Sequence, residues 1–255
     1  MEHLARIAAL YRYPVKGLTP ERLDQVAVTA GETFPYDRAY AIENGPGRFD
    51  PVAPKHLPKI NFLMLMRDER LATLRTSFSD DDQVLTVLRD GKQVARGQLT
   101  SKTGRAMIEQ FMAAYMKSAL RGAPKIVSAP GHAFSDVADK CIHIVNLASV
   151  RELERTAGRS IDPLRFRANV YIDDLPPWAE FDLVGQQVTI DQVGLDVWAR
   201  TVRCDATNVD PTTGARDLAI PNMLSRAYGH MDFGVYASIT SDGVMKAEAV
   251  MKRAS

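Results

Sequence analysis

The stretch "WARTVRCDATNVDPTTGARD", residues 198–217, leads from a strand-like run into a turn-rich segment. Its first residues, "WARTV", are rich in aromatic and β-branched side chains, which favours a strand. The residues after them are rich in Asp, Asn, Thr, Pro and Gly, which favour turns. Cys204 therefore stands at the end of a predicted strand, with Arg203 beside it. We expect its side chain to face a cleft rather than to fill the core.

Strand-like segments dominate the rest of the chain. They are short, apolar or alternating, and bounded by glycine and proline. The segment 82–99 is typical of a hairpin, with Asp90-Gly91 as its turn. The other predicted strands cover residues 5–15, 23–31, 36–42, 140–146, 165–173, 186–191, 194–202, 232–239 and 243–251. Because strands dominate and no regular alternation of strand and helix occurs, a mainly β (α+β) architecture is favoured over a doubly wound sheet.

Two helices interrupt the strands. Apolar side chains from Ile108 to Leu120 recur at helical spacing, and Ser101 or Thr103 can cap the start of this helix. The second predicted helix covers residues 147–158, with Asn146 as its N-cap and a glycine at its end. A boundary near Gly122, where the composition becomes loop-like, divides the chain into expected domains of residues 1–121 and 122–255.

Composition excludes several classes of function. The 255 residues carry a formal net charge of +1, so no general attraction to nucleic acid or to an anionic membrane is implied. No run of apolar residues is long enough to span a bilayer, and no secretory signal is visible. The two cysteines, Cys141 and Cys204, form no zinc-finger or CxxC spacing. We therefore expect a cytoplasmic protein with reduced thiols.

Common catalytic motifs are absent from the sequence. Neither GxGxxG nor GxxxxGK[ST] occurs, and there is no GxSxG elbow. The five histidines are scattered, and His143 lies in an apolar strand, where a hydrogen-bonded core histidine is the favoured interpretation. A nucleophilic Cys–His pair stays possible, although nothing nominates the histidine.

Basic residues near strand ends offer a more specific signal. Lys16, Arg38, Arg165, Arg167 and Arg203 all stand at such positions. In "RFR", residues 165–167, strand alternation would put both arginines on one face. They are either solvent-exposed or converge on a phosphate, which guanidinium groups bind bidentately. Spacing alone leaves both alternatives open.

Several segments together resemble the MOSC family, named for the C-terminal domain of molybdenum cofactor sulfurase, with its N-terminal β-barrel domain. The resemblance covers nearly the whole chain and implies an N-terminal β-barrel-like domain packed on a MOSC β-barrel domain with a few helices. The matching segments, in the order of the family, are "YRYPVKGL" (11–18), "YDRAYAI" (36–42), "RFRANVYID" (165–173), "PPWAEFDLVGQQVTI" (176–190), "VRCDATNVDPTTGARD" (202–217) and "FGVYASI" (233–239).

Characterised relatives imply the chemistry. The chain is similar to the mitochondrial amidoxime-reducing component and to bacterial enzymes that reduce N-hydroxylated bases, in which a cysteine holds molybdenum on a pterin (molybdopterin). By this resemblance Cys204 is the catalytic and metal-binding residue. The residues that the resemblance places around the cofactor are Lys16, Arg38, Arg167, Asn169, Arg203 and Tyr236. For Asn169, and for Asp210 in the loop after the cysteine, a structural role is an equal alternative.

The resemblance implies a small N-hydroxylated substrate and a separate electron-donor protein with flavin, haem or iron–sulfur, because no such motif is visible here. Binding of pyridoxal phosphate belongs to the family as a whole and is assigned to no residue. Two alternatives are open. The protein is a carrier that holds sulfur as a persulfide on Cys204 or delivers the molybdenum-pterin, or it is a barrel that has lost the cofactor and has a structural or peptide-binding role. Gly17 departs from the reductases, which commonly have serine there.

Overall fold

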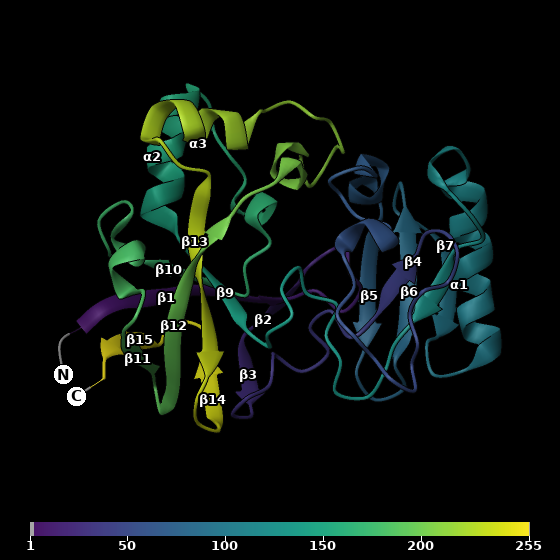
Figure 1. The fold of residues 1–255 in the computed structure, drawn as a ribbon, viewed down its shortest axis with the longest axis horizontal. Helices are drawn as coiled ribbons and strands as arrows, with labels where there is room; N and C mark the ends of the chain where they lie inside the picture. The colour runs from purple at the N-terminus through teal and green to yellow at the C-terminus, as the bar shows by residue number, and fades with distance from the viewer. Residues whose placement is uncertain (1–2, 255) are drawn as a thin grey trace.

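Seven strands close into a barrel in the computed structural model, which describes residues 3–254 (Figure 1). Neighbouring strands are antiparallel except β9 and β10, which run parallel. The order around the barrel is β10 (Val170–Asp173), β9 (Ile142–Asn146), β13 (Asp232–Ile239), β12 (Val193–Val202), β11 (Gln187–Ile190), β15 (Val250–Arg253) and β1 (His3–Arg12). The expected mainly β architecture with few helices is confirmed.

The first strand of the chain closes this barrel. β1 pairs with β10 on one side and with β15 on the other, with Ile7 opposite Ile172 and Ala5 opposite Met251. In Figure 1 the purple β1 lies among the green and yellow strands of the C-terminal half. β2 (Glu21–Leu23) extends the sheet along β1, and β3 (Gln25–Val28) pairs with β14 (Gly243–Lys246). Strands from both expected segments, 1–121 and 122–255, thus share one sheet; the division itself stays a prediction.

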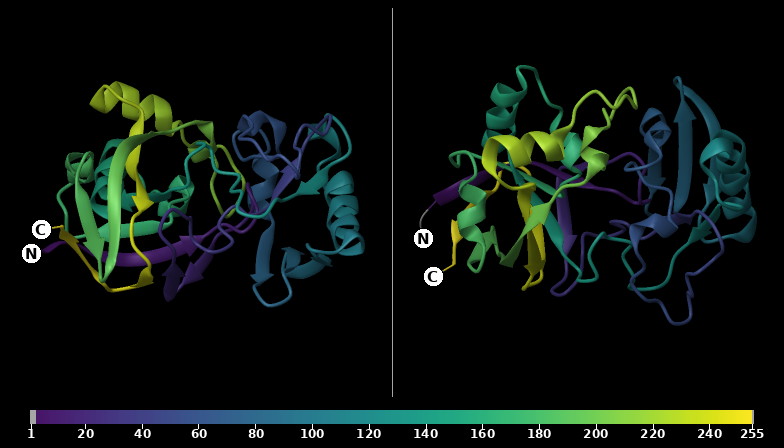
Figure 2. Two further views of the ribbon diagram at one scale, coloured as in Figure 1. Left: turned by 60° about the horizontal axis from the view of Figure 1, so that its bottom comes forward. Right: turned by 45° about the horizontal axis from the view of Figure 1, so that its top comes forward.

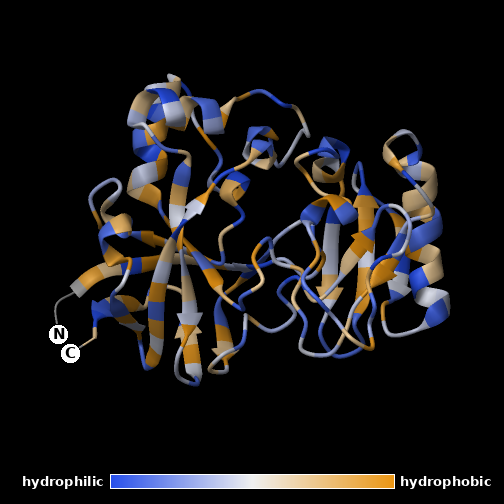
Figure 3. Ribbon diagram, viewed as in Figure 1, coloured by the Kyte–Doolittle hydropathy of each residue, from blue (hydrophilic) through white to orange (hydrophobic). Residues whose placement is uncertain are grey.

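Alternating side chains fill the barrel. Along β12, Val193, Leu195 and Val197 are fully buried, whereas the residues between them are partly exposed. This is the pattern of a strand with one face on the core. Figure 3 shows the same alternation of hydrophobic and hydrophilic residues along the barrel strands. Ile7 and Leu10 of β1 enter the same core with no exposed area.

Two helices cover one end of the barrel (Figure 2). α2 (Leu147–Ala157) begins at Asn146, whose side chain accepts the N–H of Ala148, and ends at Gly158, whose φ is 66°. This confirms the predicted caps. α3 (Ile220–Tyr228) was not predicted. It packs with α2 over a second apolar cluster that includes Phe166 and Phe233. No helix within residues 3–254 combines the length and apolar composition needed to cross a membrane.

The middle of the chain forms a second unit beside the barrel. β5 (Arg75–Ser79), β6 (Val84–Arg89) and β7 (Lys92–Gln98) make a three-stranded sheet, and β4 (Ala41–Glu43) pairs with β8 (Lys125–Val127). The turn between β6 and β7 is Asp90-Gly91, with φ of 51° and 74°, which confirms the predicted hairpin. In Figure 1 this unit lies to the right of the barrel.

α1 (Lys102–Tyr115) covers this three-stranded sheet. Ser101 accepts the N–H of Gly104, so the predicted cap is confirmed, and Ile108 and Met112 are fully buried. A Cβ atom on Gly97 would lie 2.1 Å from the carbonyl oxygen of Gly104, so glycine allows the helix to touch β7. Short 3₁₀ helices complete the fold: η1 (Lys59–Asn61), η2 (Glu69–Thr73), η3 (Lys117–Ala119), η4 (Pro163–Phe166), η5 (Ala179–Leu183) and η6 (Asp205–Asn208).

Three predicted strands need correction. Residues 36–42 and 165–173 were expected to be extended throughout, but strands begin only at Ala41 and Val170. Arg38 and Arg167 both have a φ of 52°, in the left-handed region, so the backbone turns at each arginine. The C-terminal segment 243–251 is interrupted at Glu248, whose φ is 68°, and gives β14 and β15 rather than one strand.

Candidate functional site

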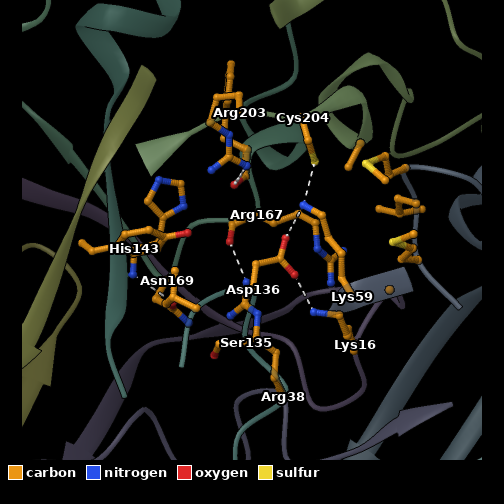
Figure 4. A pocket seen from close by; sticks show the side chains of 18 of the residues that line it. Lys16, Arg38, Lys59, Ser135, Asp136, His143, Arg167, Asn169, Arg203 and Cys204 are labelled. Atoms are coloured by element: carbon orange, nitrogen blue, oxygen red, sulfur yellow. Dashed lines mark hydrogen bonds and ion pairs between the residues drawn. The ribbon is translucent and has the colours of Figure 1, made fainter. Parts of the chain in front are cut away.

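A pocket lies where the barrel meets the second unit (Figure 4). Its open space is about 780 Å³, a figure that includes the solvent at its mouth. One wall comes from the barrel strands β9 and β13 and from the ends of β10 and β12. The opposite wall comes from the segment after β1, from η1 and from the residues that follow η1.

Cys204 stands at the rim between strand and turn, as expected. β12 ends at Val202, and Cys204 is the N-cap of η6 with an extended backbone, φ −119° and ψ 175°. Its carbonyl oxygen accepts hydrogen bonds from the N–H and the hydroxyl of Thr207, which fixes the turn. The thiol is partly exposed and lines the pocket. Within residues 3–254, no group of three or more His, Cys, Asp and Glu side chains is suited to hold a metal ion.

Two lysines and one carboxylate connect Cys204 to the opposite wall. Lys59 Nζ lies 3.3 Å from Cys204 Sγ and 2.9 Å from Asp136 Oδ2, and Asp136 Oδ1 lies 2.5 Å from Lys16 Nζ. Lys16 also donates to the carbonyl oxygen of Phe134. Figure 4 shows Asp136 between the two ammonium groups.

The charged carboxylate of Asp136 and the ammonium groups of Lys16 and Lys59 stabilise one another. Burial opposes the charged form of Asp136, but Lys16 and Lys59 outweigh it and hold the pKa of the carboxyl well below its usual value. Burial also lowers the pKa of Lys16, which Asp136 offsets only in part. For Lys59, burial is outweighed by Asp136 and Cys204, so its pKa is raised and the ammonium is charged at neutral pH.

Arg38 and Arg167 stack on a buried aromatic platform. Their guanidinium carbons lie 4.6 Å and 4.3 Å from the ring centroid of Tyr13, a distance at which cations interact with aromatic faces. Arg38 pairs with Asp37 and donates to the carbonyl oxygen of Arg167 at 3.0 Å. Burial raises the pKa of Tyr13 to about 12, so the ring is the neutral phenol. The platform fixes both guanidinium groups at the pocket.

Arg167 and Arg203 have no carboxylate within 4.0 Å among residues 3–254. Arg167 donates to the carbonyl oxygen of Leu18, and Arg203 donates to that of Phe166, both at 2.9 Å. Arg203 Nε is buried and has no hydrogen-bond partner among the residues that the structure describes. Burial, together with the charge of Arg38, lowers the pKa of Arg167 to about 10. Two cations with unused donors therefore line one pocket, a setting that favours an anion.

Asn169 and His143 hold the barrel strands beneath the pocket. Asn169 Oδ1 accepts the N–H of His143 at 3.1 Å, and its Nδ2 donates to the carbonyl oxygen of Tyr11 at 3.2 Å. His143 is buried, and its Nε2 lies 3.2 Å from the carbonyl oxygen of Phe233. His143 is thus the expected hydrogen-bonded core histidine, and it also lines the pocket.

We expect His143 to make stability depend on pH below about 6.5. Burial, followed by the charge of Arg203, holds its pKa well below the usual value, so the unfolded chain binds this proton first. Stability is complete above the unfolded pKa and falls as pH falls towards the folded pKa, by about 1.4 kcal/mol per pH unit. Urea unfolding of wild type and His143→Gln between pH 5 and 6.5 measures the difference in slope. Parallel slopes would contradict this assignment.

Tyr236 and Cys141 complete the barrel wall. Tyr236 stacks on Trp198 with ring centroids 5.3 Å apart, and burial raises its pKa, so it is a neutral phenol. Cys141 is buried, and burial raises the pKa of its thiol to about 12. It nevertheless lines the pocket.

Gly17 is required by the backbone at this position. Its φ is +84°, a conformation that disfavours other residues, and an added Cβ would lie 3.0 Å from the carbonyl oxygen of Leu63. A serine here would be strained in the present arrangement. Glycine in place of the serine that is common in the reductases therefore allows the second unit to pack closely against the loop after β1.

The structure brings every predicted site residue into this one pocket: Lys16, Arg38, Arg167, Asn169, Arg203, Cys204 and Tyr236. Their roles toward a ligand stay predictions. Arg165 lies elsewhere, because the 3₁₀ turn separates it from Arg167, and it pairs with Asp210 and Asp217. Asp210 also accepts the N–H groups of Thr212 and Thr213, which is a turn-forming role.

Sequence reasoning missed Lys59, Asp136 and the apolar residues Met64, Leu65 and Met66, which also line the pocket. Lys59 ends a proline-rich loop, and Asp136 lies in another loop before β9. Neither segment has a periodic pattern, and the partners of Lys59 are 77 and 145 positions away. No local signal could have identified them.

Known proteins share sequence with this chain. Residues 125–252 match the MOSC domain, and residues 4–122 match the MOSC N-terminal beta barrel domain. Molybdenum cofactor sulfurase of Drosophila pseudoobscura pseudoobscura is 37% identical over 98 residues, which cover 37% of this chain and 12% of that protein. The protein of the same name from Caenorhabditis elegans is 30% identical over 109 residues, covering 41% and 15%. The matched regions are thus a small part of these relatives.

Solved structures are more distant. The YuaD protein from Bacillus subtilis aligns over 97% of this chain and 93% of its own, with 12% identity and a TM-score of 0.45. YiiM from Geobacillus stearothermophilus aligns over 45% of this chain and 54% of its own, with 18% identity and a TM-score of 0.36. Family membership therefore rests on the sequence matches, which together account for nearly all of residues 4–252: the chain is a member of the MOSC family and carries the family's N-terminal β-barrel domain.

Proposed function

We propose that the pocket binds a molybdenum–pterin cofactor through Cys204 and that the protein there reduces small N-hydroxylated compounds. One observation carries the proposal: a partly exposed thiol shares a pocket with Arg167 and Arg203, two arginines that pair with no carboxylate of residues 3–254. The names of the sequence relatives, molybdenum cofactor sulfurases, support an association with this cofactor.

The residues present fit such a group. A thiolate is a soft ligand, suited to a metal already bound by sulfur. Arginine binds phosphate through two parallel N–H donors, and no described residue accepts a hydrogen bond from the buried Nε of Arg203. Arg167 and Arg203 would hold the anionic part of the cofactor. Lys16 and Arg38 already pair with Asp136 and Asp37, so they would act mainly by shaping and charging the wall.

When bound, the cofactor would supply two-electron redox chemistry. A hydroxylamine-type group R–NH–OH takes up two electrons and two protons, its N–O bond breaks, and R–NH₂ and water leave. Lys59 Nζ lies at the sulfur and can donate a hydrogen bond to the oxygen that departs. The apolar side chains of Met64 and Leu65 can contact the remainder of the substrate and keep water from it. Electrons would come from a separate protein with flavin, haem or iron–sulfur.

A sulfur carrier is the second candidate. The relatives are named sulfurases, and Lys59 would stabilise the negative charge of a persulfide on Cys204 Sγ, since its ammonium lies 3.3 Å away. In that case Cys204 would hold sulfane sulfur and no metal.

Elemental analysis distinguishes the two candidates. The protein is produced in a host that makes molybdenum cofactor, purified without reductant, and assayed for molybdenum and for cyanide-labile sulfur. We expect about one molybdenum per chain, together with turnover of benzamidoxime when an artificial electron donor is supplied. Sulfane sulfur without molybdenum would support the carrier, and neither molybdenum nor sulfane sulfur would contradict both.

A further inference from the structure

The ammonium group of Lys59 contacts the sulfur of Cys204 directly. Its Nζ lies 3.3 Å from Sγ, and 29% of its side chain is exposed, so it stands at the open side of the pocket. It belongs to η1 in the second unit, whereas Cys204 follows a barrel strand. A molecule that approaches the sulfur from the mouth therefore passes an ammonium group.

The pocket around this ammonium is strongly cationic. Five basic side chains line it against the single carboxylate of Asp136. The positive groups are Lys16, Arg38, Lys59, Arg167 and Arg203. Asp136 is shared by two lysines, and Asp37 offsets Arg38 alone. Positive charge thus remains in excess at the sulfur, also after one anionic group has bound Arg167 and Arg203.

The surface next to Lys59 is apolar. Met64, Leu65 and Met66 follow η1 and line the pocket, and Ala206 faces it from η6. Met64 and Leu65 are held in the fold with 5% and 9% of their surface exposed. Thioether and aliphatic groups favour contact with a flat apolar ligand. The space beside Cys204 therefore combines an apolar wall with one ammonium group.

We propose that Lys59 makes the access to Cys204 charge-selective: the protein accepts apolar substrates that are anionic or neutral and excludes cationic ones. The selectivity among substrates rests on the proposed function. It narrows the substrate class from N-hydroxylated bases in general to neutral or carboxylate-bearing N–O compounds. The charge selectivity of the pocket toward any molecule that approaches Cys204 depends on Lys59 and its surroundings alone.

The expected effect is large enough to measure. Even at the dielectric constant of bulk water, a unit charge roughly 5 Å from an ammonium changes a rate about fourfold. The ammonium raises the reaction rate of an anion and lowers that of a cation, so the ratio of the two rates changes about 15-fold. The change is larger in the lower dielectric of the pocket.

Charged thiol reagents test the pocket without cofactor. A methanethiosulfonate reacts with the Cys204 thiolate to form a mixed disulfide and release methanesulfinate. The rates of a sulfonate-bearing and a trimethylammonium-bearing reagent are compared at one pH, so the thiolate fraction cancels in their ratio. Mass spectrometry of the Cys204 peptide excludes any contribution from Cys141. We expect the anion-to-cation ratio of the folded protein to exceed that of the urea-unfolded chain about 15-fold.

Variants assign the effect to Lys59. Lys59→Gln should lower the anion-to-cation ratio by the factor of about 15 that one charge at this distance accounts for, whereas Lys59→Arg should keep the ratio. The other basic side chains of the pocket leave a residual preference for the anion in Lys59→Gln. Lys55→Gln, an exposed lysine of the same loop that does not line the pocket, is the matched control and should behave as wild type. A wild-type ratio equal to that of the unfolded chain, or a Lys59→Gln ratio equal to wild type, would overturn the proposal.

A second measurement uses the molybdenum-loaded protein and two benzamidoximes, one with a para carboxylate and one with a para trimethylammonium group. A kcat/KM at least tenfold higher for the carboxylate supports the proposal. Equal or reversed values would overturn the selectivity and leave the reductase assignment intact. Turnover of neither compound, with the thiol reagent ratio as expected, would contradict the proposed function and support the selectivity of the pocket.

Discussion

Replacing Cys204 by alanine is expected to leave a folded protein that retains less than about one hundredth of the wild-type molybdenum affinity. Loss of groups that merely orient a metal ligand costs 10–100-fold in affinity, and loss of the ligand itself costs at least as much. The fold should survive because the thiol is only partly buried and its hydrogen-bond contact is Lys59, at the pocket mouth. Truncations at such sites usually change the free energy of unfolding by less than about 1 kcal/mol.

Three measurements separate loss of the ligand from loss of the fold. Molybdenum content and benzamidoxime turnover should both disappear in Cys204→Ala, while the urea midpoint stays near wild type. Cys204→Ser offers a hard oxygen in place of the soft sulfur and should retain little metal. Cys141→Ala, at the other pocket-lining cysteine, should keep molybdenum even if it is less stable. Full activity of Cys204→Ala would show that this residue does not hold the metal.

Local sequence signals predicted the elements that depend on neighbouring residues. Ser101 and Asn146 cap α1 and α2 because a capping side chain reaches only the next turn of the chain. The Asp90-Gly91 turn needs two left-handed residues, which this dipeptide supplies. These rules act over a few residues, so the sequence contains all the information that they need.

Strand alternation failed where the backbone turns at an arginine that lines the pocket. Arg38 and Arg167 adopt left-handed conformations because each is held by tertiary contacts: both stack on Tyr13, and Arg38 bonds Asp37 and the Arg167 carbonyl. Nothing local marks an arginine for this conformation. The resemblance nevertheless named both residues for the pocket. It could not supply Lys59 or Asp136, whose contacts form only when distant loops meet.

The position of β1 is the other feature that local reasoning could not supply. "ARIAALYRYPV" predicts a strand, but its apolar pattern does not say which strands it joins. The structure places it between β10 and β15, more than 150 residues away in sequence, where it closes the barrel. Barrel closure removes unpaired strand edges. A strand from the N-terminal part of the chain therefore completes a sheet whose other strands come from the C-terminal part.

We therefore expect a fragment of residues 122–255 to be unfolded. It contains six of the seven barrel strands and lacks β1, which leaves the edges of β10 and β15 unpaired. The lost side chains of Ile7 and Leu10 are fully buried, and each such residue contributes about 1.5–3 kcal/mol. Val26 and Val28 of β3, which pair with β14, are lost as well. Together these losses approach the stability of a typical domain, about 5–15 kcal/mol.

A matched deletion tests barrel closure separately from the size of the fragment. Replacing residues 36–127 by a flexible linker keeps all seven barrel strands and the buried Phe34 of the barrel core. This shorter chain should fold, with cooperative urea unfolding and dispersed amide resonances, while the 122–255 fragment should show neither.

The same pair of proteins tests whether the cofactor site is shared. The linker-closed barrel retains Cys204, Arg167 and Arg203 but lacks Arg38 and Lys59, so it should bind the molybdenum–pterin at least tenfold more weakly than the full chain. Cofactor affinity equal to that of the full chain would place the site within the barrel alone.

Cooperative folding of residues 122–255 would show that β1 is dispensable. Because a ligand stabilises the state that binds it, the full chain should also unfold at higher urea when loaded.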